Sequence, residues 1–527
     1  MNLTNKKLSK SLIGISIILL ALTGCLLAWY ATQWGPWAFS DSAAYVSSAL
    51  NFNKGLGISL RSANGILSTL DHFPPLYPLL LALSMRSGLD YLSAGRILDM
   101  LSFALLLFSL GIGTFIFTKQ TWLFFFICLL VLFSPVMLDA FTGLMTEPIF
   151  IALFYASFIL TLLYCQQQKP ILLIFAICFT SLLPSIRYAG IFACVSNAVL
   201  IFFFQKNQSL KRFRNSLLFG LTSSIPILAW FLFNYFSTHT LGARTFIQSG
   251  QLSVKVMDYL RSAGNVFLSW LPYYQHHTTI ISDELKVCLF VGFLIALSSI
   301  SFFFYQRKKK TDNTDPLITF IVAGISSILI YLFVLCAIFL FTSPPPVIDS
   351  RMLSPLVPAF TIVIGSVCIF FINQVPSRWK YPAIVIMLIF AIFQIRFNFL
   401  ITLSHAKTYH EYGYGYTARE IQTSSFVKAI RQIPESTTLI ANTPAMTLLY
   451  TNRMPYPLEF ISTAPFGQRA MEIDRIYVNQ KAALILDYAA IRNVYTDWEE
   501  RLSAFTKGLE MDFQDEIGGI YYYPIAK

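Results

Sequence analysis

The chain has 527 residues, of which 56% are hydrophobic and only 12% are charged, and its mean hydropathy is +0.62. Soluble globular proteins carry roughly 25% charged residues, so this composition excludes a soluble globule and indicates a membrane protein. The formal net charge is +12, but its distribution along the chain argues against a nucleic-acid partner.

Apolar runs of about 20 residues are needed to cross a roughly 30 Å hydrocarbon core, and about eleven runs meet this need. The first is preceded by three lysines and contains Leu22-Thr23-Gly24-Cys25, which is typical of a lipoprotein cleavage site. The apolar run continues to Tyr30, however, which favours an uncleaved signal anchor. The expected spans are 11–31, 92–117, 121–138, 147–165, 170–186, 188–204, 215–236, 285–305, 316–342, 352–373 and 380–402.

Basic residues gather at the N-terminus and in alternate short loops, for example from Lys211 to Arg214 and from Arg307 to Lys310. Such loops remain in the cytoplasm, so the pattern predicts a cytoplasmic N-terminus and an extracytoplasmic C-terminus. The positive charge is therefore a signal of membrane orientation.

Two of the predicted outer segments, 32–91 and 237–284, are too long to be simple connections. The first contains helical patterns at 41–53 and 75–86, which we expect to lie at the membrane interface. In the second, His276, His277, Asp283 and Glu284 offer metal-ligand atoms, but their spacing fits no known site, so the need for a divalent metal is left open. The cysteines lie in or beside apolar spans without a Cys-x-x-Cys pair, which favours packing over disulfides or zinc.

Ionisable residues recur at the outer ends of the spans, where a charge is costly without a partner or a function. Arg96 and Asp99 are three residues apart and predict an ion pair on one helix face. Glu147, in Thr146-Glu147-Pro148, suits the positive end of a helix. The other members are Arg187, Asp349 and Arg351. The alternative for each is a structural ion pair or a solvated helix end.

Two motifs in the first outer segment indicate chemistry. Asp41 follows the first span in Ser40-Asp41-Ser42, and Asp71-His72-Phe73-Pro74-Pro75 follows about thirty residues later. A carboxylate just outside the bilayer, followed by a rigid Pro-Pro turn, can remove a proton from an acceptor. With Thr146-Glu147-Pro148 and Arg187-Tyr188-Ala189-Gly190, in this order, the chain resembles the GT-C glycosyltransferases over roughly residues 1–400. The most similar branch is glycosyltransferase family 39, the protein O-mannosyltransferase and aminoarabinose-transferase type.

The resemblance implies a polyprenyl-phosphate-linked sugar donor, a lipid, glycan or protein acceptor on the outer face, surrounding membrane lipids and no cofactor. It also implies a bacterial inner or cell membrane as the location. By position, Asp41 takes the role of general base, with Glu147 as a second catalytic acid. His72, Arg187 and Arg351 are assigned to the donor phosphate. The two arginines suit this role because a guanidinium binds phosphate through two parallel hydrogen bonds. Substrate binding is assigned to Tyr45, Asp71, Tyr77 and Asp349.

The chain departs from the family pattern at two positions. Phe73 separates His72 from the prolines, and Ser42 stands where many relatives have a second acid. No glycine-rich nucleotide loop is visible, which agrees with a donor delivered through the membrane.

After residue 403 the chain becomes richer in charges and turn residues. Helices are expected at 417–432 and 466–481, and strands at Thr438–Ala441, Ala483–Asp487 and Gly519–Tyr523. The expected architecture is therefore a polytopic α-helical GT-C-like membrane domain, 1–402, followed by a small extracytoplasmic α/β domain, 403–527. Tyr412, Tyr414 and Tyr416 between them either stack on a sugar or belong to an interfacial linker.

Other classes of function remain open. A transporter or flippase should show two matching halves with broken helices, which the sequence does not show. A polymerase or ligase of lipid-linked glycans shares the topology and the donor lipid, but does not call for Asp41 together with the His72 motif. A non-catalytic assembly factor is a third alternative.

Overall fold

A computed structural model describes residues 3–61, 66–206, 208–239, 242, 251–270, 281–311, 315–458, 482–493 and 495–522. The chain forms two compact units. Unit 1 comprises Met1–Ala31, Asp71–Leu76 and Arg96–Thr408, and unit 2 comprises Thr32–Leu70, Tyr77–Gly95 and Tyr409–Lys527.

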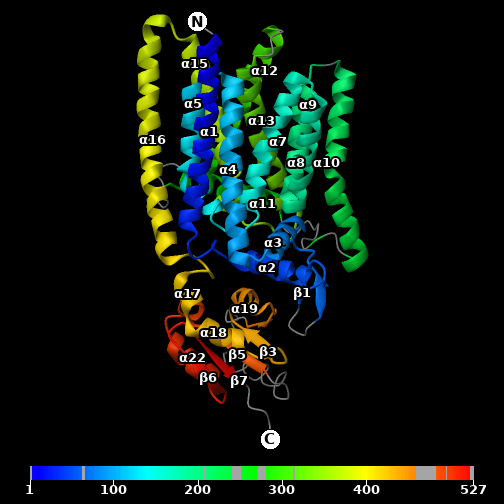
Figure 1. Ribbon diagram of the computed structural model, residues 1–527, viewed down its shortest axis with the longest axis vertical. Coiled ribbons are helices and arrows are strands. Elements are labelled where there is room, and N and C mark those ends of the chain that lie inside the picture. The colour runs from blue at the N-terminus through cyan, green and yellow to red at the C-terminus, as the bar shows by residue number, and fades with distance from the viewer. Residues whose placement is uncertain are drawn as a thin grey trace. The chain divides into compact units, whose positions relative to one another are not determined.

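Unit 1 is built from helices (Figure 1). They are α1 (Leu3–Ala31), α4 (Tyr91–Thr118), α5 (Thr121–Leu132), α6 (Pro135–Ala140), α7 (Glu147–Gln167), α8 (Pro170–Ile186), the 3-10 turn η1 (Tyr188–Gly190), α9 (Ile191–Phe204), α10 (Ser209–Thr238), α11 (Leu252–Ser269), α12 (Asp283–Thr311), α13 (Pro316–Phe341), α14 (Ser350–Leu353), α15 (Leu356–Gln374) and α16 (Ser377–Tyr412). The first residues of α4 and the last residues of α16 belong to unit 2.

Eight of the described helices are long and apolar enough to cross a membrane: α1, α4, α7, α10, α12, α13, α15 and α16. The shorter apolar helices α5, α8 and α9 coincide with the three remaining predicted spans. The protein is therefore a multi-pass integral membrane protein. The predicted span 121–138 is wrong in detail, because the chain breaks at Phe133 and Ser134 between α5 and α6. Pro135 lacks a backbone N–H and so begins a new helix more readily than it continues one.

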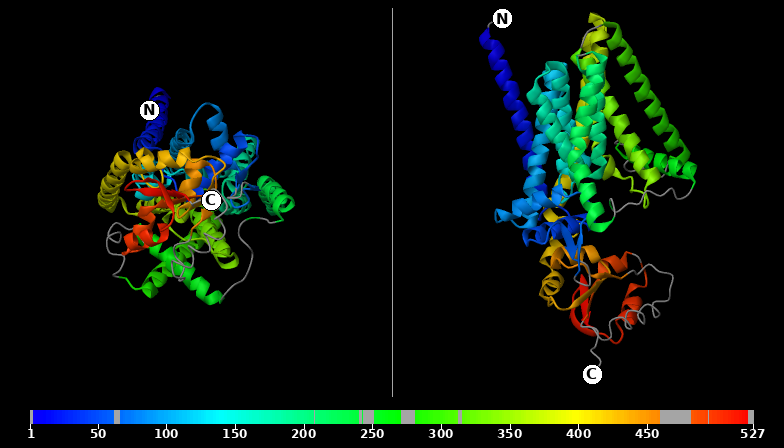
Figure 2. Two further views of the ribbon diagram at one scale, coloured as in Figure 1. Left: turned by 90° about the horizontal axis from the view of Figure 1, so that it is seen from below. Right: turned by 90° about the vertical axis from the view of Figure 1, so that its right-hand side faces the viewer.

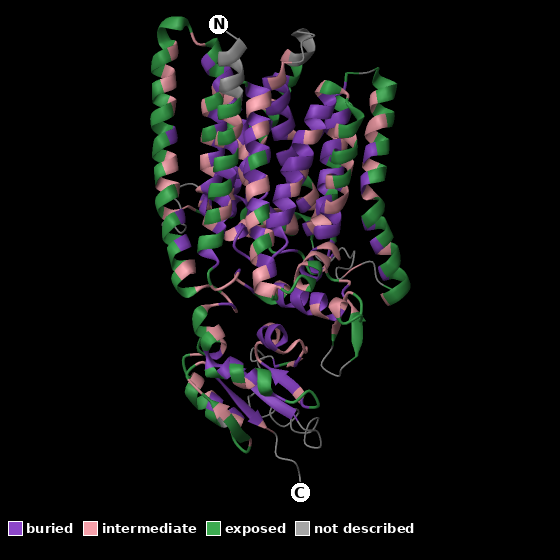
Figure 3. Cartoon of the chain, viewed as in Figure 1, coloured by how far each residue is buried: buried purple, intermediate pink, exposed green. Residues whose placement is uncertain are grey.

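The core of unit 1 lies around α7, most of whose residues are buried, whereas α10 and α16 are largely exposed along their lengths (Figure 3). Helices that face lipid have this character, since their apolar side chains need no protein cover. Hydrogen bonds hold the buried helices together. Asn197 on α9 donates to Ser157 on α7 at 3.1 Å and to Thr180 on α8 at 2.9 Å.

Unit 2 contains the two helices that the sequence predicted in the first outer segment, α2 (Ser40–Asn53) and α3 (Leu76–Arg86), although Leu76 itself belongs to unit 1. Their location at the membrane interface stays a prediction. Between them lies an antiparallel hairpin of β1 (Ser59–Arg61) and β2 (Leu67–Thr69), in which Leu60 pairs with Ser68. The hairpin was not predicted, because strands of three residues carry too little alternation to be recognised.

The C-terminal part of unit 2 has a five-stranded sheet in the order β4-β3-β5-β7-β6. Its strands are β3 (Thr438–Ala441), β4 (Tyr456–Pro457), β5 (Ala482–Asp487), β6 (Glu510–Gln514) and β7 (Gly518–Tyr522). The first three are parallel, and β7 is antiparallel to both β5 and β6. The strands predicted at 438, 483 and 519 are therefore confirmed within the described residues.

Helices cover both faces of this sheet, which Figure 2 shows in orange and red. Phe426 and Ile430 pack on one face, and Ile491 and Leu502 pack on the other. The predicted helix 417–432 is interrupted at Ser424, whose hydroxyl accepts from Val427 N and caps a new helix. The predicted helix 466–481 lies outside the described residues. The helices are α17 (Arg419–Thr423), α18 (Ser425–Gln432), α19 (Pro444–Thr451), α21 (Tyr488–Arg492) and α22 (Trp498–Thr506).

Within unit 2 the first outer segment and the C-terminal segment fold together. Asn452, beyond the end of α19, donates to the side chain of Asn51 on α2 at 3.2 Å. The Thr417 hydroxyl donates to the Pro36 carbonyl at 2.8 Å. The α/β sheet is thus joined to α2, the helix that carries Asp41.

Candidate functional site

The most unusual charged group in unit 1 is Glu147, the first residue of α7. Its side chain is only 1% exposed. Thr146 is the N-cap of α7 and Pro148 occupies a first-turn position, so local sequence starts the helix here. The positive end of the helix favours a carboxylate, but burial at this depth also demands a charged partner.

Two arginines from separate parts of the chain meet this carboxylate. Arg187 forms an ion pair with Glu147 Oε1, and Arg351 Nε lies 3.4 Å from the same oxygen. Arg187 also donates to Thr146 Oγ1 at 3.2 Å and contacts Met352 Sδ at 3.0 Å. We call Glu147, Arg187 and Arg351, with Thr146, the charged cluster. It joins α7, the turn after α8 and α14.

The turn that holds Arg187 has a clear local cause. Arg187 follows the last residue of α8 in an extended conformation, and Gly190 N donates back to its carbonyl at 2.7 Å. A Cβ at Gly190 would overlap the backbone of Leu183 and Pro184, so only glycine fits this close approach. The sequence Arg187-Tyr188-Ala189-Gly190 thus places the guanidinium beside α7.

Arg351 stands in α14, a single helical turn capped by Asp349. Asp349 Oδ1 accepts from Met352 N at 2.8 Å, and its other oxygen lies 4.0 Å from Arg351 Nε. The side chains of Arg351 and Asp349 are 35% and 44% exposed. Two guanidinium groups therefore share one buried carboxylate, and Asp349 is more distant and more solvated. The charged cluster is suited to bind an anion.

The Asp71-His72 segment is tied to the same turn of unit 1. The Tyr188 hydroxyl, next in sequence to Arg187, donates to the Asp71 carbonyl at 2.8 Å. Trp230 Nε1 donates in turn to the Tyr188 oxygen at 3.2 Å. His72 is exposed, with its ring centroid 5.3 Å from that of Phe73. The assignment of Asp71 and His72 to substrate and phosphate stays a prediction.

The other predicted site residues lie in unit 2. Asp41 is in the first turn of α2, partly exposed, and Ser40 Oγ donates to its Oδ1 at 3.4 Å. Tyr45 and Tyr77 are buried, with ring centroids 5.1 Å apart in an edge-to-face contact. Their packing places both rings in the core of unit 2, as the apolar face of a helix requires. Their assignment to substrate binding stays a prediction.

The predicted ion pair between Arg96 and Asp99 is wrong. Arg96 Nη2 donates to the Trp29 carbonyl at 2.5 Å, and its guanidinium lies 5.2 Å from the Trp29 ring centroid. Asp99 is fully buried, and neither carboxylate oxygen has a hydrogen-bond partner among the described residues. Helical spacing predicted the pair, but a contact with another helix, which spacing does not reveal, replaced it.

Sequence reasoning also missed the part that Thr146 and Met352 play in holding Arg187. Thr146 had been recognised only as a helix start, and nothing in the sequence pointed to Met352. Tyr414 and Tyr416 pack on Phe39 at 5.4 and 5.7 Å between ring centroids. Among the residues that the structure describes, no group of three or more His, Cys, Asp or Glu side chains is placed to hold a metal ion. His276 and His277 lie outside those residues.

No protein-family model matches the chain, and a search of curated proteins finds no match. Solved structures do match. ArnT from Cupriavidus metallidurans, in a crystal structure with undecaprenyl phosphate bound, aligns over 96% of this chain and 98% of its own, with a TM-score of 0.55 at 12% identity. The oligosaccharyltransferase of Archaeoglobus fulgidus aligns over 97% of this chain and 74% of its own, with a TM-score of 0.51 at 10% identity. Likeness at this identity shows a shared fold.

Proposed function

We propose, on the premise that this chain has the GT-C fold of those two structures, that it is a membrane glycosyltransferase using a polyprenyl-phosphate-linked sugar as donor. The acceptor would lie on the outer face of the membrane and be a lipid, a glycan or a protein. The observation that carries the proposal is the charged cluster, in which two arginines share one buried carboxylate.

The charged cluster suits a phosphate that becomes a leaving group. Arg351 is about one-third exposed, so an anion can reach its guanidinium, and Arg187 holds its place through Glu147 and Thr146. Fixed positive groups stabilise the negative charge that develops on the phosphate as the sugar leaves. The undecaprenyl phosphate bound to ArnT supports a donor of this chemical class for the shared fold.

In the proposed reaction, the bond between the anomeric carbon and the phosphate oxygen breaks, and the phosphate leaves with the electron pair. The acceptor oxygen forms the new bond to the anomeric carbon and gives up its proton. Asp41 is proposed as the base that takes this proton, following the resemblance of its motif. The side chain of Asp41 is partly exposed at the start of α2, as a base that meets an external acceptor must be.

Glu147 receives a different role from the one that the sequence suggested. Its carboxylate is almost fully buried and is engaged by two guanidinium groups, so we propose that it positions the arginines and does not handle a proton in transfer. Asp349 likewise caps α14 and places Arg351. These contacts explain the position of Asp349, and no direct contact between Asp349 and the substrate is needed.

The proposal is tested with purified full-length protein and a labelled polyprenyl-phosphate sugar. Transferase activity releases polyprenyl phosphate and moves the label to an acceptor from membrane extracts. A flippase would instead move the intact labelled lipid across proteoliposomes without cleaving it. Translocation without release of polyprenyl phosphate would therefore overturn the proposal.

Orientation is a second part of the proposal. We propose that the N-terminus lies in the cytoplasm and unit 2 outside it, which the basic residues in alternate loops support. Reporter tags at positions 308 and 450 should be labelled from opposite sides, the former from the cytoplasm. Labelling of both from one side would show that the assignment of spans between 311 and 403 is wrong.

A further inference from the structure

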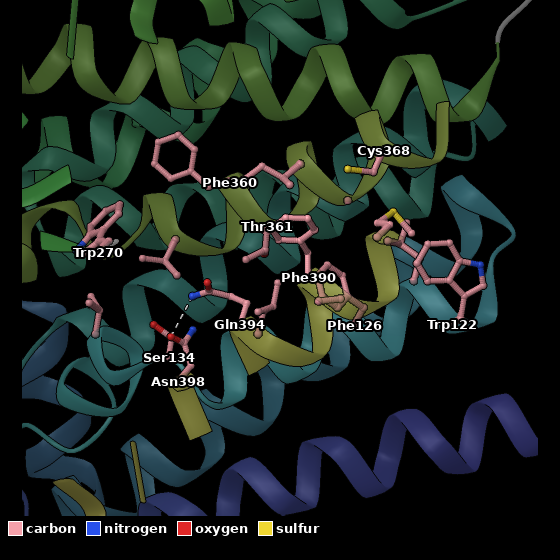
Figure 4. Close-up of a pocket in the computed structure, with 18 of the residues that line it drawn as sticks. Trp122, Phe126, Ser134, Trp270, Phe360, Thr361, Cys368, Phe390, Gln394 and Asn398 are labelled. Atoms are coloured by element: carbon pink, nitrogen blue, oxygen red, sulfur yellow. Dashed lines mark hydrogen bonds between the residues drawn. The ribbon is translucent and has the colours of Figure 1, made fainter. Parts of the chain in front are cut away.

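A long cavity of about 410 Å³ lies within unit 1, away from the charged cluster's own side chains. Its walls come from α5, α15 and α16, with Trp270 at the end of α11 (Figure 4). Phe126, Phe360 and Phe390 line it. Phe390 is also 71% exposed, so the cavity borders the surface that faces the bilayer. We call it the α16 groove.

The length of the α16 groove matches one leaflet of a membrane. On α15 the lining runs from Val357 to Cys368, and on α16 from Met387 to Asn398. Each stretch covers twelve residues of helix, which rise by about 17 Å from the first to the last. One leaflet contributes about half of a roughly 30 Å hydrocarbon core. A single hydrocarbon chain of a leaflet lipid would fill a groove of this length.

One end of the α16 groove is polar. In Figure 4, Trp270, Ser134 and Asn398 lie toward one end, whereas Trp122 and Cys368 lie at the other. Gln394 Nε2 donates to Asn398 Oδ1 at 3.1 Å. The indole nitrogen of Trp270 is buried, and it has no hydrogen-bond partner among the described residues. A buried N–H without a partner is costly, so this end is built for a molecule that brings an acceptor.

We propose that the α16 groove binds one acyl chain of a membrane lipid, with the ester or amide carbonyl of that chain accepting from Trp270 Nε1. The phosphate of the proposed donor is assigned to Arg187 and Arg351, which do not line the groove. The donor would therefore bring only its hydrocarbon chain to the groove and leave the indole N–H unsatisfied. The polar end therefore favours an acyl lipid over the tail of the proposed donor. This inference concerns a site separate from the arginines that hold the donor phosphate.

The position of the α16 groove determines where the headgroup of the acyl lipid would lie. Residues of α6, which line the polar end, precede Met145, whose sulfur lies 4.0 Å from Arg351 Nη1. Helix α15, which forms one wall, begins three residues after α14 ends. A lipid headgroup above the polar end would lie on the same side of unit 1 as α14.

Photo-crosslinking of the full-length protein in nanodiscs tests the groove without measuring transfer. The probe is a phosphatidylethanolamine with a diazirine near the end of one acyl chain. Ala391, which lines the groove and is 8% exposed, is changed to Trp to fill it. Ile392, the next residue, is 63% exposed and outside the lining, so Ile392→Trp is the matched control. We expect labelling of α5 and α15 to fall at least several-fold in Ala391→Trp and to persist in Ile392→Trp.

A second experiment tests the carbonyl contact. Ester-linked and ether-linked forms of the same lipid compete for the probe site. The wild-type protein should bind the ester-linked lipid about 2- to 10-fold more tightly, which corresponds to the net free energy of one hydrogen bond. Trp270→Phe keeps an aromatic ring, removes the N–H and should abolish this preference.

Two outcomes would overturn the inference. One is equal labelling in Ala391→Trp and Ile392→Trp, which would mean general contact with bilayer lipid. The other is displacement of the probe by undecaprenyl phosphate as readily as by an acyl lipid, which would assign the groove to the donor tail. Neither result depends on transferase activity, so the proposed function stands or falls separately.

Discussion

The two units hold their important carboxylates in opposite ways. In unit 1, Glu147 is almost fully buried and shares one oxygen between two arginines from distant parts of the chain. In unit 2, Asp41 is partly exposed in the first turn of a helix, where the Ser40 hydroxyl is 3.4 Å from it. Breaking a buried pair leaves an uncompensated charge and damages the fold, whereas an exposed carboxylate can be changed with little structural cost. Loss of activity is therefore easier to interpret at Asp41 than at Glu147.

The largest effect is expected at Asp41. Asp41→Asn keeps the size and polarity of the side chain but removes the basic oxygen, so turnover should fall roughly 10²- to 10⁴-fold. Release of polyprenyl phosphate measures the turnover, and thermal unfolding should remain unchanged. Asp90→Asn is the matched control, because Asp90 is likewise a carboxylate at a helix start in unit 2, where it accepts from the backbone N–H groups of Leu92 and Ser93. Near-normal turnover in Asp41→Asn would remove Asp41 from the mechanism.

The second effect concerns stability in unit 1. Glu147→Ala leaves Arg187 and Arg351 without their shared partner, and should lower the free energy of unfolding by about 3–5 kcal/mol. Glu147→Gln retains an acceptor and should cost less. Unfolding in detergent measures both. Asp283, which is 59% exposed and pairs with Lys286 at 2.9 Å, provides the control, and Asp283→Ala should change stability less than Glu147→Ala. Equal free energies of unfolding for Glu147→Ala and the wild type would contradict the prediction that Arg187 and Arg351 need a buried carboxylate as their shared partner.

A smaller difference should separate the two arginines. Arg351 is more exposed than Arg187, at 35% against 16%, so Arg351 should contribute more to phosphate binding and Arg187 more to the fold. Arg351→Lys should weaken binding of a polyprenyl-phosphate sugar by about 10-fold, because a point charge replaces a planar fork. Arg187→Lys should instead lower the melting temperature. If Arg351→Lys lowers stability without changing affinity, Arg351 belongs to the scaffold and the phosphate site must be sought elsewhere.

The smallest effect is a pH dependence in unit 2, where Asp487 is buried and has no guanidinium partner among the described residues. Burial raises the pKa of Asp487, and the backbone N–H groups of Ala489 and Ala490 offset this only in part. Between the ordinary value of about 3.9 and the raised value, the folded state holds more protons than the unfolded state. The contribution of Asp487 to stability is therefore complete below the ordinary value and is lost as pH rises through the raised one.

Asp487→Asn should remove this dependence, since an amide does not titrate and still caps the helix. Melting temperatures of both proteins between pH 4 and 7 check it. Parallel curves for the two proteins would contradict the prediction.

In each unit, the sequence alone predicted some elements and missed others. Apolar runs of sufficient length predicted the membrane helices, since span length follows from bilayer thickness. The same reasoning joined α5 and α6 across Ser134, because hydropathy does not register the break that Pro135 imposes. In unit 2 the buried strand Ala482–Asp487 was visible as a continuous apolar run. The hairpin of Ser59–Arg61 and Leu67–Thr69 had no such apolar run.

The charged cluster was predictable only residue by residue. Glu147, Arg187 and Arg351 stood out because charges at the ends of apolar spans are rare. That both arginines would meet one carboxylate depends on how α7, α8 and α14 pack, which no spacing encodes. The failure at Arg96 has the same origin, because its partner, the carbonyl of Trp29, lies on another helix.

Gly190 has a consequence for how the turn after α8 tolerates substitution. Any side chain at position 190 would overlap the backbone of Leu183 and Pro184 at the end of α8 and would displace the arginine three residues before it. Even the smallest replacement, Gly190→Ala, should therefore disturb the charged cluster from a position that contributes no side chain to it.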